Sequence, residues 1–179
     1  VVDSAPNYDR PYEPWKSPKR RVALSLPTDI NSWVSVLMKQ LDSVNFVDRS
    51  WIYNQYDQRV GAGTARDCRS NVGVVELPET GRALGVVLGC RPQVMKMDAK
   101  LGGFDAIAFP CLELAAKGFE PLAATDCLNF GNPERPEIMS EFVVAIETMS
   151  EVCKELDVPV ISGNVSLYNE TNETNIIST

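Results

Sequence analysis

Short apolar, β-branched runs alternate with helical patterns from about residue 70 onward, and this alternation constrains the fold more than any other feature. Two such runs, at residues 72–75 and 83–88, flank Pro78-Glu79-Thr80-Gly81 and predict a β-hairpin. Apolar residues then recur at helical spacing over residues 104–115, and Gly118 follows as a typical helix-ending residue. The first part of this region therefore predicts a hairpin followed by a helix.

The rest of the region repeats the alternation. Residues 121–126 predict a buried strand, Pro136 is well placed to begin a second helix, and residues 158–161 predict another short strand. Pro110 lies inside the first helical pattern and is expected to kink or interrupt that helix. Together these elements predict an α/β (α+β) fold, with a mixed sheet and helices on one face.

The first 69 residues follow different patterns. Residues 1–20 contain four prolines and predict an extended arm or linker, whereas residues 21–69 predict a helical connector. We therefore expect three parts, of which the last, residues 70–179, is an α/β domain.

The connector contains three predicted elements. Residues 21–26 predict a short strand, and Thr28 or Asp29 can cap a helix that continues to Leu41. A shorter helical stretch is predicted over residues 49–56.

The composition argues against two classes of partner. A net charge of −7 disfavours a nucleic acid partner, and no apolar run approaches the roughly 18 residues of a membrane-spanning helix. The start of the chain shows no secretory pattern, and the five cysteines form no Cys-x-x-Cys pair. We therefore expect a cytoplasmic protein with reduced thiols. The sequence has no histidine, so an enzyme built on it must take its usual proton-transfer group from elsewhere.

The segment Thr125-Asp126-Cys127-Leu128-Asn129-Phe130-Gly131-Asn132-Pro133 follows one predicted strand and precedes a helix. Asp126 offers a hard oxygen ligand that suits a nucleotide or a magnesium-bound phosphate. The alternative is an ordinary strand-to-helix turn, in which the polar side chains bond only to the local backbone.

A second candidate segment, Ser162-Gly163-Asn164-Val165-Ser166, follows the last predicted strand. Gly163 permits close approach of a phosphate, Asn164 offers a neutral oxygen to a metal, and Ser166 offers a hydroxyl to a substrate. An ordinary Gly-Asn turn is again the alternative.

Three motifs occur in one order along the chain: Trp51-Ile52-Tyr53-Asn54-Gln55-Tyr56-Asp57, the segment 125–133, and Ser162 through Thr171. In combination they resemble the large synthetase subunit of the phosphoribosylformylglycinamidine synthase (formylglycinamide ribonucleotide amidotransferase) family, of the separate-subunit type. The resemblance covers residues 33–179. It implies the N-terminal part of the second of two units that are each similar to aminoimidazole ribonucleotide synthetase.

That family makes formylglycinamidine ribonucleotide from formylglycinamide ribonucleotide, ATP and glutamine-derived ammonia, with ATP and Mg²⁺ as cofactors. By resemblance, Asp126 and Gly163 contact ATP, Asn164 is a magnesium ligand and Ser166 contacts the substrate. A glutaminase subunit and a small accessory subunit are the implied partners. The family's catalytic histidine lies in the first unit, so no catalytic residue is assigned here. The isolated chain is expected to be inactive and to self-associate.

One departure from the family pattern supports a different interpretation. Gly89 stands where the segment Leu88-Gly89-Cys90-Arg91-Pro92 would carry an acidic residue. A lost carboxylate favours a structural nucleotide-binding pseudo-site without a direct catalytic role. Aminoimidazole ribonucleotide synthetase itself is disfavoured by the segment 125–133, and a stand-alone nucleotide-binding module is the remaining alternative.

Overall fold

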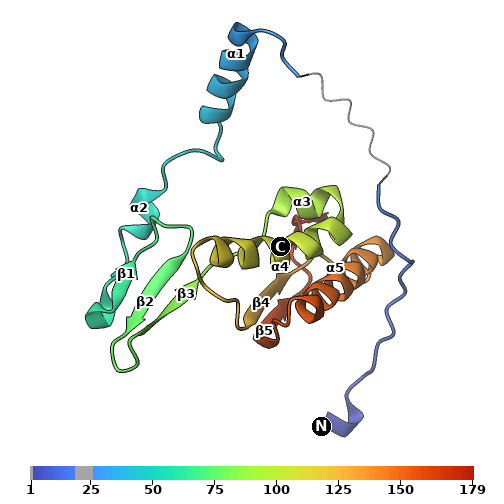
Figure 1. Ribbon diagram of the computed structural model, residues 1–179. Helices are drawn as coiled ribbons and strands as arrows, with labels where there is room; N and C mark the ends of the chain where they lie inside the picture. The colour runs from blue at the N-terminus through green and yellow to red at the C-terminus, as the bar shows by residue number, and fades with distance from the viewer. Residues whose placement is uncertain (1, 19–25) are drawn as a thin grey trace.

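The computed structural model describes residues 2–18 and 26–179. The elements after residue 60 form the body of the molecule, whereas helix α1 (Ile30–Leu41) stands apart from it (Figure 1). Asp29 caps α1 as predicted, because its carboxylate accepts a hydrogen bond from the amide of Ser32. The shorter helix α2 (Ser50–Tyr53) is also present. The strand predicted at residues 21–26 falls, except for Leu26, outside the described residues.

The predicted hairpin is confirmed within a three-stranded antiparallel sheet. Its strands are β1 (Thr64–Arg66), β2 (Gly73–Leu77) and β3 (Arg82–Val86), in the order β1-β2-β3. The β2–β3 turn ends at Gly81, whose φ of 64° is adopted more readily by glycine than by any other residue. A short 3-10 helix, η2 (Val60–Ala62), precedes β1, and another, η1 (Val2–Ser4), lies near the N-terminus.

Two helices follow the hairpin. Helix α3 comprises Pro92–Met97, and helix α4 comprises Ala99–Ala116. The prediction that Pro110 interrupts this helix is wrong, since α4 continues through it for a further six residues to Ala116. The helix then ends as predicted, with Gly118 in a left-handed conformation at φ 84°.

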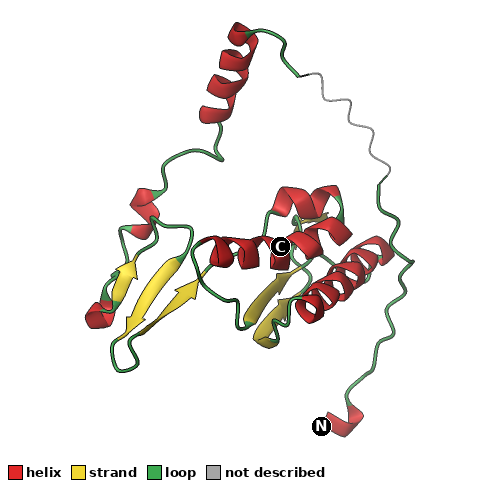
Figure 2. Cartoon of the chain, in the orientation of Figure 1, coloured by secondary structure: helices red, strands yellow, loops and turns green. Residues whose placement is uncertain are grey.

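The second half of the body is a parallel β–α–β unit (Figure 2). Strands β4 (Ala124–Asn129) and β5 (Val160–Ser166) pair in parallel, and helix α5 (Pro136–Glu155) connects them. The α/β class is confirmed, and both kinds of strand pairing occur. They occur in separate sheets, however, rather than in the one mixed sheet that the sequence predicted.

The core lies where helices α3, α4 and α5 meet strand β4. Its buried members come from all four elements and from the residue after β4: Met95, Ala99, Leu128, Phe130, Val144 and Ala145. Helices α4 and α5 approach so closely that a β-carbon on Gly103 would lie 2.7 Å from the carbonyl oxygen of Ala145. Gly102 and Gly103 are both buried, but Gly102 faces α3, since a β-carbon there would lie 2.5 Å from the Cα of Met95.

A two-residue hairpin follows β5. Strands β6 (Glu170–Thr171) and β7 (Thr174–Asn175) are joined by Asn172 and Glu173, both with positive φ, at 49° and 60°. Two consecutive positive φ angles are typical of the tight turns that suit the twist of paired strands.

The N-terminal arm is docked on the body instead of behaving as a free linker. Arg10 forms an ion pair with Glu134 at 3.2 Å and donates a hydrogen bond to the Tyr168 hydroxyl at 3.0 Å. The amide of Glu13 donates to the Ser140 hydroxyl at 2.9 Å. The sequence missed these contacts because each joins residues more than 100 positions apart.

Trp15 fastens the arm to the helices. Its ring packs against the core, and its Nε1–H donates to the Asp98 carboxylate at 3.0 Å. Burial would raise the pKa of Asp98, but hydrogen bonds from Ser17 and Trp15 and from nearby amides outweigh it and lower that pKa. Asp98 therefore both caps α4 and anchors the arm. In the described ranges, no helix is long and apolar enough to cross a membrane.

Candidate functional site

The predicted site residues lie within strands β4 and β5, not in loops that follow them. Asp126 is the third residue of β4, and β5 continues through Gly163, Asn164 and Ser166. The sequence indicated loops because Gly and Asn are typical of turns. Parallel pairing between the two strands overrides that local preference, since every residue from Ser162 to Ser166 has a cross-strand partner on β4.

Asp126 and Gly163 are direct cross-strand neighbours. The Asp126 carboxylate lies over Gly163, so that a β-carbon at position 163 would overlap its oxygen atoms. Within the described part of the chain this carboxylate accepts no hydrogen bond, and it is partly exposed. The missing side chain of Gly163 therefore leaves room for a carboxylate that is free to bind a ligand.

Asn164 and Ser166 lie on the opposite face of the same two strands. Successive side chains of a strand point to opposite faces, so Asn164 and Ser166 share a face with their partners Cys127 and Asn129. A 3.7 Å contact between the Asn129 amide and the Cys127 sulfur shows that these two side chains lie together. The four predicted residues thus form two pairs, one on each face of the sheet.

This division limits how one ligand can use all four residues. In the described part of the chain, β5 has no hydrogen-bonded neighbour on its outer side. A ligand can therefore reach both faces around that edge or past the carboxyl ends of the two strands.

The predicted magnesium ligand, Asn164, has few potential co-ligands around it in the described structure. Among the described residues, no group of three or more His, Cys, Asp or Glu side chains is placed to hold a metal ion. Asn164 is exposed and offers one amide oxygen, with hydroxyls of Ser162 and Ser166 on the same face. These oxygen atoms could supply only a few of the ligands of a Mg²⁺ ion. That is compatible with its chemistry, because Mg²⁺ commonly keeps several waters and binds substrate phosphates alongside few protein ligands.

The loop after β4 is held in place by side-chain amides that the sequence reasoning did not single out. Asn175 accepts a hydrogen bond from the amide of Asn132 at 2.8 Å, and Asn169 donates to the carbonyls of Phe130 and Ser166, each at 2.9 Å. Asn169 lies within the third sequence motif, which was the available signal for it. Asn175 lies outside every motif quoted.

Two further contacts close this loop over the β6–β7 hairpin. Arg135 pairs with Glu170 at 3.4 Å and donates to the carbonyl of Glu173 at 3.2 Å. The strands that carry the candidate site are thus linked at their carboxyl ends by a network of polar contacts.

Gly89 has a structural explanation that is independent of any metal. A β-carbon at this position would overlap the ring of Pro110 and lie 3.0 Å from the carbonyl oxygen of Ala106. An acidic side chain at position 89 is therefore incompatible with the observed placement of α4.

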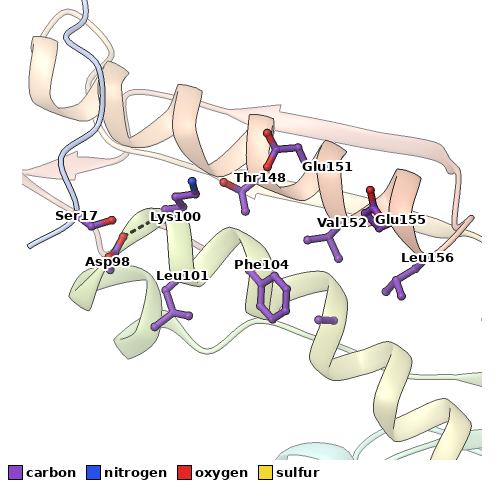
Figure 3. Close-up of a pocket in the computed structure, with 11 residues that line it drawn as sticks. Ser17, Asp98, Lys100, Leu101, Phe104, Thr148, Glu151, Val152, Glu155 and Leu156 are labelled. Atoms are coloured by element: carbon purple, nitrogen blue, oxygen red, sulfur yellow. Dashed lines mark hydrogen bonds between the residues drawn. The ribbon is translucent and has the colours of Figure 1, made fainter.

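A separate groove lies between α4 and α5 (Figure 3). It has a volume of about 560 Å³. The side chains of Phe104, Val152 and Leu156 line its apolar floor, while Asp98 and Lys100 lie at one end beside Ser17 of the arm. None of the four predicted site residues lines this groove.

A family model described as AIR synthase related protein, N-terminal domain, matches residues 69–179. The chain belongs to this family. The predicted likeness to the N-terminal domain of aminoimidazole ribonucleotide synthetase is thereby confirmed. The β4–β5 and β6–β7 sheets lie wholly within the matched residues, whereas strand β1 of the first sheet lies before them.

Curated relatives extend the match beyond this AIR synthase related domain. The chain is 43% identical to phosphoribosylformylglycinamidine synthase subunit PurL of Gluconobacter oxydans over 172 residues, which is 96% of this chain and 23% of the relative. It is 44% identical to the PurL subunit of Aquifex aeolicus over 188 residues, covering 99% of this chain and 25% of the relative. The resemblance seen in the three motifs is confirmed, and it includes the N-terminal arm. The chain spans about a quarter of the length of these relatives.

Solved structures of Thermotoga maritima proteins share the fold. The structure of PurLQS superimposes with a TM-score of 0.73 at 24% identity, covering 99% of this chain and 27% of that one. PurL complexed with AMPPCP gives a TM-score of 0.69 at 25% identity, covering 99% of this chain and 27% of that one. PurL complexed with FGAR gives a TM-score of 0.61 at 27% identity, covering 73% of this chain and 21% of that one.

Proposed function

We propose that this chain is the N-terminal part of the second synthetase unit of a phosphoribosylformylglycinamidine synthase large subunit. In this proposal Asp126 and Gly163 contact ATP, Asn164 is a magnesium ligand and Ser166 contacts formylglycinamide ribonucleotide. The observation that carries the proposal is the unpaired Asp126 carboxylate lying over Gly163, directly across from it in the parallel sheet. Relatives and neighbours named for this enzyme, or complexed with AMPPCP and FGAR, support the ligand classes.

The proposed contribution of this chain is positioning. Phosphoryl transfer depends chiefly on aligning groups and neutralising charge, and rigid strands hold side chains more reproducibly than loops do. Mg²⁺, when bound, would neutralise charge on the nucleotide phosphates. Asn164 would present one oxygen toward the ion, and Ser166 would hold the substrate on the same face.

The remaining chemistry is assigned to other parts of a larger assembly. Without histidine, this chain has no ordinary proton-transfer group at neutral pH. We therefore propose that the first unit supplies that group, that a glutaminase subunit supplies ammonia, and that a small accessory subunit is a further partner in the assembly. The assembly is proposed to work in the cytoplasm, and the isolated chain to be inactive.

A substitution at Gly163 tests the nucleotide site. In the full-length enzyme that contains this chain, Gly163→Val should displace the Asp126 carboxylate and weaken Mg·ATP binding by about tenfold or more. Gly163 lies in an exposed stretch of β5, and valine favours strands, so the midpoint of thermal unfolding without ligand should not fall. Titration calorimetry with Mg·ATP and thermal unfolding measure both quantities.

The matched control is Gly73→Val in β2, where the nearest atom to an added β-carbon is 3.8 Å away. This variant should bind Mg·ATP like the wild type. If Gly163→Val also binds normally, the assignment of Asp126 and Gly163 to the nucleotide site is wrong.

The 179-residue chain alone is proposed to self-associate through its uncovered strands. On β5, Ile161 is 69% exposed and Val165 is 52% exposed, and the outer edge of this strand is unpaired in the described structure. Exposed apolar edges of this kind favour pairing between copies. Sedimentation of the wild type at high concentration should show a dimer or larger species.

Two lysine variants make this prediction specific. Ile161→Lys places a charge at the apolar edge and should shift the chain toward monomer. Leu88→Lys is the control, because Leu88 is 93% exposed but lies beyond the end of β3. A wild-type chain that sediments only as a monomer at high concentration contradicts the prediction.

A further inference from the structure

From Thr125 to Asn129, the face of the β4–β5 sheet that carries Asn164 and Ser166 consists of small, uncharged polar side chains. Three cross-strand pairs form it: Thr125 with Ser162, Cys127 with Asn164, and Asn129 with Ser166. Parallel sheets are normally covered on both faces by apolar packing. Here Leu128 packs with α5 on one face, whereas Thr125, Cys127, Ser162 and Asn164 on the other face are exposed.

Cys127 occupies the centre of this polar face. It lies directly across from Asn164, and neighbouring strands are about 4.8 Å apart. A ligand atom bound to the Asn164 amide therefore lies within reach of the Cys127 sulfur. Asn129 fixes its own amide beside this thiol, donating to the Cys127 carbonyl at 2.9 Å and lying 3.7 Å from the sulfur.

We propose that Cys127 lines the substrate-facing surface of the ligand site and limits the size of the group that binds there. This inference rests on the proposed roles of Asn164 and Ser166. The bound group would be the neutral, hydrogen-bonding portion of a phosphorylated ribonucleotide, since the six side chains include donors and acceptors but no Lys or Arg. Because the Cys127 side chain is short and lies between the amides of Asn129 and Asn164, it leaves room for a ligand at the centre of this face.

Differential alkylation provides the test, because Cys68 is a built-in control. Cys68 and Cys127 are both exposed, but Cys68 lies between β1 and β2, away from the polar face. The full-length enzyme containing this chain is treated with iodoacetamide, with and without Mg·ATP and formylglycinamide ribonucleotide. Peptide mass spectrometry follows each cysteine. At ligand concentrations about ten times Kd, alkylation of Cys127 should slow by about tenfold, following the ligand-free fraction, while Cys68 is unaffected.

Two substitutions distinguish direct contact between Cys127 and the substrate from protection that arises through a change elsewhere in the protein. Cys68→Leu, the control, enlarges an exposed cysteine away from the polar face and should leave KM for formylglycinamide ribonucleotide near the wild-type value. Cys127→Leu protrudes into the proposed surface and should raise this KM, while the midpoint of unliganded thermal unfolding stays unchanged because the position is exposed. A Leu variant with normal KM contradicts the size-limiting role.

The outcomes also distinguish this inference from the proposed function. If both ligands bind but Cys127 reacts at an unchanged rate, the inference is wrong and the proposed function stands. A Cys127 thiol that is unreactive even without ligand also overturns it, since protein then covers the face. If neither ligand binds, the proposed function fails and this inference fails with it.

Discussion

Replacing Asn164 by alanine in the full-length enzyme that contains this chain should lower substrate-dependent ATP turnover by about 10²-fold or more. Removing one preorganised group that faces developing charge typically costs about 10²–10³ in rate. Asn164 is exposed, and its side chain makes no hydrogen bond in the described structure, so its loss should not affect folding. Asp126→Ala should reduce turnover comparably, because its carboxylate is likewise unpaired. Steady-state ATP hydrolysis dependent on formylglycinamide ribonucleotide measures both.

This measurement also decides between the two interpretations of the site. A control, Asn31→Ala, removes an exposed amide from α1 and should leave turnover unchanged. If the Asn164 and Asp126 variants are folded, fail to bind nucleotide and yet turn over normally, the nucleotide site is structural. The catalytic role proposed for this half is then wrong, and the chemistry belongs to the other synthetase unit.

Gly103→Leu should be the most destabilising single substitution among those considered. A β-carbon at this position already lies 2.7 Å from the Ala145 carbonyl oxygen and 3.1 Å from its Cα, so leucine must push α4 away from α5. Overpacking of this kind costs about 1–3 kcal/mol or more, which exceeds the roughly 1 kcal/mol that helix propensity regains. The midpoint of thermal unfolding should therefore fall by several degrees, roughly 2–8 °C.

Ala115→Leu provides the control, because it adds the same side chain to an exposed position of the same helix. Circular dichroism should show little change in its unfolding midpoint. Should Gly103→Leu unfold at the wild-type temperature, the close contact between α4 and α5 is not a determinant of stability.

The sequence predicted those helices and strands that are determined by neighbouring residues in the chain. The β2–β3 hairpin was predictable from its turn residues, and α5 from Pro136 and the apolar period that follows. The extent of β5 was not predictable, because Ser162 to Ser166 become a strand only by pairing with β4, more than 30 residues earlier. The continuation of α4 through Pro110 was also not predictable. Gly89, which is distant in sequence, leaves the space that the proline ring occupies.

The candidate site was predictable in composition but not in arrangement. The motifs identified Asp126, Gly163, Asn164 and Ser166, and the structure places all four on two adjacent strands. Which face each side chain occupies follows from register, and register is a property of the pair of strands rather than of either one. The sequence therefore could not indicate that the four residues divide between two faces, or that Cys127 lies beside Asn164.

The docked arm has a consequence for how the protein is made. Glu13 bonds to Ser140, a residue 127 positions later, so the arm cannot dock until the residues that receive it have been synthesised. At about 5–20 residues per second, roughly 6–25 s of synthesis separate the two ends of this contact. During that interval Trp15 has no core to cover it. A chaperone that recognises exposed aromatic groups would therefore find Trp15 accessible while the residues up to Ser140 are being made.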